Sequence, residues 1–239
     1  MQHKIFNSNQ LKFIAIVAMT LDHISWLLFP GYSTYPLAVI FHIIGRITAP
    51  IMWFFISEGY HHTRNVKKYL MRLFILAFVS HFSYNFFFGI SFIPLRDSVL
   101  NQTSVIWPLA WGLVILCIND SKHFKEWQKM LLTILICIIS FPADWSCIPV
   151  IAILFMHEER GNLKKQMIWM MLCCFAYAIV YFVFVDKLYG VIQLFTCLSI
   201  PLLARYNGEK GKGKHVGRIF YIYYPLHLVM LGVLKLIIF

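Results

Sequence analysis

The sequence has 239 residues, of which 60% are hydrophobic and 13% are charged, and its formal net charge is +11. Soluble domains carry about 25% charged residues, and apolar runs recur here along the whole chain, which excludes a single buried core with polar loops. We therefore predict an all-α, polytopic transmembrane helical bundle. The long unbroken runs disfavour a transmembrane β-barrel, and no recognition motif accompanies the positive charge, so nucleic acid is not an expected partner.

The apolar segments predict about nine spans within a single membrane-embedded domain that covers residues 1–239. Their approximate limits are 11–30, 36–57, 69–91, 102–118, 127–142, 145–157, 165–185, 188–205 and 217–238. The sixth span is short, which leaves the number of spans open between residues 127 and 157. Asp22 and His23 interrupt the first span, and no small-residue cleavage site follows it, so we predict a retained helix and not a cleaved signal peptide.

Basic residues cluster in alternate loops of this map. One set of loops holds Lys4, Lys12, Arg64, Lys67, Lys68, Arg72, Lys122, Lys125, Lys129, Arg160, Lys164, Lys165, Arg205, Lys210, Lys212, Lys214 and Arg218. The other set holds only Arg96 and Lys187. Because cytoplasmic loops carry an excess of Lys and Arg, we predict a cytoplasmic N-terminus and, with nine spans, an external C-terminus.

Ionisable residues interrupt several of the predicted spans. A charged side chain at the bilayer centre costs about 2.5–3.5 kcal/mol on insertion scales, so each one needs a physical reason. A helical rise of about 1.5 Å per residue places His23, Arg46, His81 and His227 near the midplane on four helices. Adjacent helical residues point about 100° apart, so we expect Asp22 to neutralise Arg46 or to contact another helix, and not to orient His23.

Further polar residues extend this predicted chamber toward the outer side. Tyr84 and Asn85 continue the polar line of the third span, and Asp144 precedes a short span on the same side. With His81, these residues are candidates for binding an acceptor substrate. For any single buried histidine, a structural contact between helices remains the alternative. The His and Asp residues lack a recognisable ligand spacing, so no metal is predicted.

The segment SEGYHHTRNVKKYLMR, residues 57–72, is a second polar cluster, predicted at the inner membrane surface. It contains Glu58, His62, Arg64, Lys68 and Arg72. One interpretation is a solvated basic loop. The other is a binding site for a phosphate-bearing cytoplasmic donor, since Arg and Lys at helix ends suit phosphate groups.

Four segments also resemble those of a known family. They are LDHI at 21–24, IIGRITAPIMWFFISEGYHHTRN at 43–65, YLMRL at 69–73 and YYPLHL at 223–228. In this order they resemble the TraX family of bacterial membrane proteins, named for the enzyme that acetylates the N-terminus of conjugative F-pilin. The family is distantly similar to the integral-membrane acyltransferases of type 3, which modify cell-surface sugars. The middle of the chain departs from the family pattern at SVIWPLAWG, residues 104–112, which bears on the identity of the acceptor.

The resemblance implies an acyltransferase of the bacterial inner membrane. It would move an acetyl group from cytoplasmic acetyl-CoA to a hydroxyl or amine of an extracytoplasmic acceptor, either a peptide or pilin N-terminus or a surface glycan. Acyl-CoA, this acceptor and membrane lipid are the expected partners. His23 is the expected general base, with His227 as a second candidate, and Arg46 would either stabilise the oxyanion or hold Asp22.

The same resemblance assigns the donor site to the segment at the inner surface. The acyl-CoA phosphates would bind near Arg64, Lys68 and Arg72, while Glu58 and His62 would organise the donor entrance. Two other classes stay open at this stage. A proton-coupled transporter or lipid flippase also places His, Asp and Arg at the midplane, and in a scaffold such residues only join helices.

Overall fold

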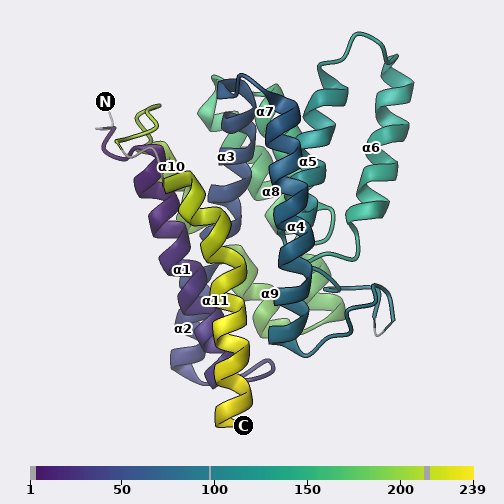
Figure 1. The fold of residues 1–239 in the computed structure, drawn as a ribbon. Helices are drawn as coiled ribbons and strands as arrows, with labels where there is room; N and C mark the ends of the chain where they lie inside the picture. The colour runs from purple at the N-terminus through teal and green to yellow at the C-terminus, as the bar shows by residue number, and fades with distance from the viewer. Residues whose placement is uncertain (1–3, 97, 213–215) are drawn as a thin grey trace. The chain divides into compact units, whose positions relative to one another are not determined.

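A computed structural model describes residues 4–96, 98–212 and 216–239, and the regular elements of this part of the chain are helices (Figure 1). They are α1 Ser8–Leu28, α2 Pro36–Gly45, α3 Thr48–His62, α4 Val66–Phe88, α5 Ile106–Asn119, α6 Glu126–Ser140, α7 Ile148–Glu158, α8 Leu163–Phe184, α9 Lys187–Gln193, the 3-10 helix η1 Leu194–Leu198, α10 Ser199–Ala204 and α11 Val216–Ile238. The prediction of a polytopic helical bundle is confirmed.

Six segments in the described part of the chain are long and apolar enough to cross a membrane. They are Ser8–Leu28, Pro36–His62, Val66–Phe88, Leu163–Phe184, Lys187–Ala204 and Ile219–Ile238. The other three predicted spans form the shorter helices α5, α6 and α7. The chain is therefore a multispanning membrane protein in which every predicted span is helical, although three of the helices are shorter than a straight crossing requires.

Two of the predicted spans are interrupted by changes of helix geometry. The span predicted over 36–57 breaks between α2 and α3, at Arg46 and Ile47. Pro50 lacks the N–H that would bond to the Arg46 carbonyl in a continuous helix. Pro201 likewise removes the helical partner of the Cys197 carbonyl, and the preceding turn is the 3-10 helix η1.

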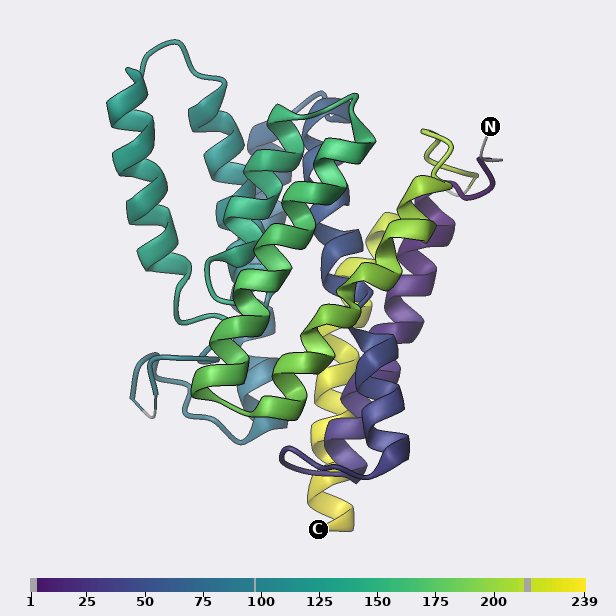
Figure 2. The same cartoon turned by 180° about the vertical axis from the view of Figure 1, so that it is seen from behind.

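The helices form two compact units, each assembled from separate stretches of sequence. The first contains Met1–Phe55 and Gly161–Tyr223, and the second contains Ile56–Arg160 and Tyr224–Phe239. In the first unit α1 packs along α2, and α8 runs beside the segment formed by α9, η1 and α10 (Figure 2). In the second unit α5 packs against α4, α6 and α7.

Loop contacts in the first unit agree with the predicted division of the loops. At one end, the backbone N–H of Ile5 donates to the Arg205 carbonyl at 2.9 Å, which joins the first and last basic loops. At the other end, the Tyr189 hydroxyl donates to the Ser33 carbonyl at 3.2 Å, which joins the first turn of α9 to the loop after α1. The two sets of loops in this unit are thus at opposite ends of its helices.

In the second unit, too, the basic loops lie together at one end of the helices. Ion pairs between Glu58 and Arg160 and between Asp120 and His157 join the basic loops that follow α3, α5 and α7. At the opposite end, the Asp144 N–H donates to the Thr103 carbonyl at 2.8 Å. The assignment of the basic ends to the cytoplasm stays a prediction, and Lys214 lies outside the described residues.

Candidate functional site

Asp22, on α1, is the centre of a buried polar network in the first unit. Its Oδ1 accepts hydrogen bonds from Arg46 Nη2 at 2.8 Å and from His42 Nδ1 at 2.9 Å. Only 9% of the surface of Asp22 is exposed. A buried carboxylate needs such donors to offset its lost hydration, so this arrangement explains how Asp22 is accommodated within an apolar helix. The predicted pairing of Asp22 with Arg46 is confirmed.

Arg46 is held on three sides within the same unit. Its Nε donates to the His42 carbonyl at 3.2 Å, and its Nη1 donates to Gln193 Oε1 at 3.1 Å, in addition to the bond to Asp22. The guanidinium thereby connects α1, the end of α2 and α9. Of the two predicted roles for Arg46, these contacts agree with the one in which it holds Asp22.

His42 is a member of this network that the sequence did not single out. It has no exposed surface, and its Nε2 lies 3.2 Å from the Ser25 hydroxyl. Because Nδ1 faces a carboxylate, we assign the N–H to Nδ1, so that Nε2 accepts from Ser25. The result is a hydrogen-bonded chain from Asp22 through His42 to Ser25. Both ring nitrogens of His42 have polar neighbours. Its place four residues before Arg46, on the same helical face, was the available signal.

Gly45 permits the close approach of α1 and α2 at this network. A Cβ built on Gly45 would lie 2.5 Å from both Cβ and Oδ1 of Asp22. Such a distance is shorter than real Cβ contacts, so a side chain at position 45 would displace the carboxylate. The Gly-Arg sequence at 45–46 therefore supplies both the space for the carboxylate and one of its partners.

His23 follows Asp22 on α1 and is also buried, with 9% of its surface exposed. Successive side chains on a helix diverge by about 100°, so His23 points away from the direction in which Asp22 meets His42 and Arg46. His23 therefore lies next to a fixed, charged network without belonging to the Asp22–His42–Ser25 chain.

Polar contacts also hold part of the segment over residues 57–72, which was predicted at the inner surface. Glu58 Oε1 accepts from Arg160 Nε at 3.0 Å, and Glu58 Oε2 lies 3.4 Å from His62 Nε2. The predicted residues Glu58 and His62 are thus brought together, and Arg160 joins them from the loop after α7. The sequence interpretation did not pair Arg160 with Glu58, because the two residues lie far apart along the chain.

A pair of histidines in contact with each other, His61 and His157, lies at the same end of the second unit. His157 Nε2 is 2.8 Å from Asp120 Oδ1, and His157 Nδ1 is 2.9 Å from His61 Nε2. The two imidazole rings stack with centroids 4.8 Å apart, and the Tyr60 hydroxyl donates to Asp120 Oδ2 at 3.0 Å. A carboxylate only accepts, so His157 Nε2 carries the N–H in its contact with Asp120.

Arg64 and Lys68 lie at the N-terminus of α4, and Arg72 lies one turn after Lys68. Asn65 caps this helix by accepting from the Lys68 N–H, and Arg64 precedes the cap. Lys68 and Arg72 are four residues apart and share a helical face. Arg64, Lys68 and Arg72 are exposed, and no ion pair involves them within the described residues. Basic side chains at a helix N-terminus favour a phosphate ligand.

The residues predicted to bind the acceptor lie at the opposite end of the second unit. The side-chain amide of the fully buried Asn85 donates to the carbonyls of Ser91 and Gln102, at 2.7 and 3.2 Å. His81 Nε2 lies 2.9 Å from the Phe92 carbonyl. Asn85 and His81 thus both contact carbonyl groups of the loop after α4. For His81 the sequence had predicted a position near the midplane.

Tyr84 and Asp144 were also predicted at this end, whereas His227 was predicted near the midplane. Tyr84 is buried on α4, and Asp144 is placed by its backbone bond to Thr103. His227, on α11, is 5% exposed, and its ring centroid lies 5.6 Å from that of Tyr224. His227 belongs to the second unit and His23 to the first, so their predicted convergence remains a prediction. No group of three or more metal-ligating side chains occurs among the described residues.

Comparisons with known proteins match most of the chain. Residues 7–235 match the family described as TraX protein. The chain is also 32% identical over 234 residues to a protein of Dichelobacter nodosus named "Probable fimbrial assembly protein FimC, serogroup H1". That match covers 95% of this chain and 94% of the relative. No solved structure matches significantly.

Proposed function

Because the chain belongs to the TraX family, we propose that it is an integral-membrane acyltransferase. It transfers an acetyl group from cytoplasmic acetyl-CoA to an amine or hydroxyl on the outer side of the bacterial inner membrane. The observation that best supports this proposal is the buried Asp22–His42–Arg46 network beside His23. Charged groups within a membrane helix mark functional sites by default, and this network places a fixed carboxylate next to His23 along α1.

His23 is the general base of this proposal. A neutral imidazole accepts a proton readily near neutral pH, which suits removal of the proton from an acceptor N–H or O–H. The acceptor atom then attacks the thioester carbonyl carbon to form a tetrahedral oxyanion. When the oxyanion collapses, the C–S bond breaks, and coenzyme A leaves as a thiol after taking the proton from His23.

Asp22, held by Arg46 and His42, acts on His23 in this mechanism through its charge. Arg46 donates to three different acceptors, which fixes its guanidinium against the Asp22 carboxylate. The negative charge of Asp22 would stabilise the imidazolium that forms at His23 during the reaction. His42 supports the carboxylate from its other side.

We assign the donor phosphates to Arg64, Lys68 and Arg72 in the second unit. All three side chains are exposed, and Arg64 and Lys68 lie at a helix N-terminus, a combination that favours phosphate groups. Glu58, held by Arg160 and His62, would order the end of α3 next to this site.

The acceptor in this proposal is the amino group of a pilus subunit. The relative from Dichelobacter nodosus is named as a probable fimbrial assembly protein, and it aligns over almost the whole of both chains. The TraX resemblance points to pilin acetylation as well. A surface glycan hydroxyl is the other acceptor that the same chemistry can serve.

The proposal is tested by acetyl-CoA turnover of the purified protein with peptide and glycan acceptors. We expect acceptor-dependent release of coenzyme A, and a His23→Ala variant should lose at least about 100-fold in turnover while keeping its melting temperature. His227→Ala is measured in parallel because His227 is the second candidate base. Unchanged turnover by folded His23→Ala would remove His23 from the mechanism. Failure to release or bind coenzyme A would favour a transporter.

Donor binding is tested separately by thermal shift with coenzyme A. Lys68→Glu should reduce the stabilisation by coenzyme A, because the variant places a like charge against the phosphates. Lys122→Glu is the matched control, since Lys122 is an exposed lysine of another basic loop. Equal loss in both variants would mean that only the overall charge matters, and no loss in either would place the donor elsewhere.

A further inference from the structure

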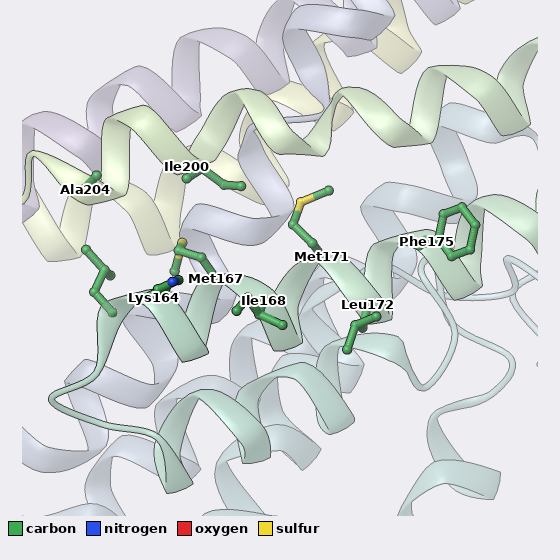
Figure 3. Close-up of a pocket in the computed structure, with 9 residues that line it drawn as sticks. Lys164, Met167, Ile168, Met171, Leu172, Phe175, Ile200 and Ala204 are labelled. Atoms are coloured by element: carbon green, nitrogen blue, oxygen red, sulfur yellow. The ribbon is translucent and has the colours of Figure 1, made fainter.

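An apolar groove lies on the first unit, away from the Asp22 network. It has a volume of about 630 Å³ and lies between the first half of α8 and α10. Its lining is aliphatic, methionine and phenylalanine side chains, together with one charged residue, Lys164. Figure 3 shows Lys164 toward one end of the groove and Phe175 at the other.

The length of the groove matches the depth of one membrane leaflet. Lys164 and Phe175 are both on α8, and eleven helical steps of about 1.5 Å separate them by roughly 16 Å. This distance is about half of a hydrocarbon core that is roughly 30 Å thick. Lys164 is in the first turn of α8, so the groove starts at the end of the helix that carries the basic loop.

The chemistry of the lining changes along this length. Met167 and Met171 line the groove, and their unbranched, polarisable side chains adapt to a flexible hydrocarbon chain. At the end opposite Phe175, Lys164 is exposed and takes part in no ion pair within the described residues. Lys165 is next to it, and Arg205 follows the lining residue Ala204. No acidic side chain lines the groove.

We propose that this groove binds one acyl chain of an anionic phospholipid, with the lipid phosphate at Lys164. A basic end and an apolar channel one leaflet deep complement the two parts of such a lipid. A zwitterionic lipid has the same tails but lacks the net charge that Lys164 would attract. The inference is independent of the acyl transfer proposed above, because it involves neither His23 nor the donor segment.

The test uses the full-length protein in detergent and compares phosphatidylglycerol with phosphatidylcholine of identical acyl chains. Binding is measured by native mass spectrometry and by thermal shift. We expect the wild type to prefer phosphatidylglycerol, and Lys164→Glu to lower its affinity for that lipid by about fivefold or more. Met171→Trp fills the groove and should weaken both lipids. Lys122→Glu and Met71→Trp, at exposed positions outside the groove, are the matched controls.

Equal affinity of the wild type for the two lipids would overturn the proposal, as would an unchanged lipid preference in Lys164→Glu. Unaltered lipid binding by folded Met171→Trp would also overturn it, because the chain would then lie elsewhere. If palmitoyl-CoA displaces phosphatidylglycerol and binds more tightly, the occupant is an acyl donor and the phospholipid assignment fails. Lys164→Glu changes an exposed residue, so it keeps the test valid if Met171→Trp does not fold.

Discussion

A carboxylate that binds a histidine occurs in both units, and the two surroundings differ. In the first unit Asp22 binds His42 at 2.9 Å, with side-chain exposures of 12% and 0%. In the second unit Asp120 binds His157 at 2.8 Å, but the Asp120 side chain is 45% exposed. The bond lengths are nearly equal, whereas the cost of leaving a partner unpaired depends on burial.

This contrast separates two kinds of polar cluster in a membrane protein. The buried network joins α1, α2 and α9. It includes the ion pair between the Arg46 guanidinium and the Asp22 carboxylate. The second cluster joins the ends of α3, α5 and α7, where water and salt reach Asp120, although the His157 side chain is only 7% exposed. Substitutions of the same chemical kind should therefore have very different effects in the two units.

The largest effect is expected for Asp22→Asn. The variant leaves Arg46 buried without its counter-charge, which costs about 3–5 kcal/mol for a buried pair. Thermal unfolding in detergent should show a large fall in melting temperature. The double variant Asp22→Asn/Arg46→Gln removes both charges and should recover part of this loss. A melting temperature equal to that of the wild type in the single variant would contradict the proposed dependence of Arg46 on Asp22.

Gly45→Ala should have the next largest effect. Its new Cβ would overlap Asp22, and overpacking of this kind costs about 1–3 kcal/mol. Gly59→Ala is the control in the second unit, because its Cβ would meet only the movable end of Tyr69, at 3.0 Å. There the higher helix propensity of alanine should leave stability equal or slightly higher. Equal destabilisation by both substitutions would show that the loss at position 45 does not come from contact with Asp22.

Asp120→Asn should destabilise the protein much less than Asp22→Asn does. Because Asp120 is nearly half exposed, we expect a loss of about 1 kcal/mol or less. The loss should shrink as salt is raised from low to physiological concentration, whereas the loss in Asp22→Asn should not. Unfolding measured across a salt series distinguishes the two. A salt-independent loss at Asp120 would mean that this cluster is shielded from solvent.

The smallest effect is expected for Glu126→Gln. Glu126 binds Lys129 at 2.9 Å, but its side chain is 89% exposed. Exposed pairs of this kind usually contribute nothing measurable, so the melting temperature should match that of the wild type. The variant is the baseline for the Asp120 result. A clear loss of stability in Glu126→Gln would mean that exposed ion pairs in this protein contribute more to stability than assumed here.

Pairing of charges could be predicted where burial made it necessary. Asp22 and Arg46 both lie in apolar segments, and the cost of two separate buried charges favours a contact between them, which the structure contains. The neutral members of the network could not be found in this way. His42 and Gln193 carry no obligatory charge, so hydropathy alone does not distinguish them from polar residues that face a loop or another helix.

The contacts in the cluster at the basic end of the second unit could not be predicted from the sequence either, because they depend on how the helices pack. His61, Asp120 and His157 are separated by long stretches of chain, and they meet because α3, α5 and α7 end at the same level. The sequence predicted that their loops share one side of the membrane. It did not indicate which residues of those loops would bind one another.

The sequence by itself determined the helical class, the positions of the apolar segments and the division of their loops into two sets. These properties follow from hydropathy and charge, which act along the chain and can be read from neighbouring residues. Only the tertiary structure decided that the chain breaks at Arg46, that Gly45 makes room for Asp22, and that His42 and Gln193 complete its network. These depend on the distances between helices that are remote in sequence, where a single Cβ or one hydrogen-bond donor determines whether two residues can meet.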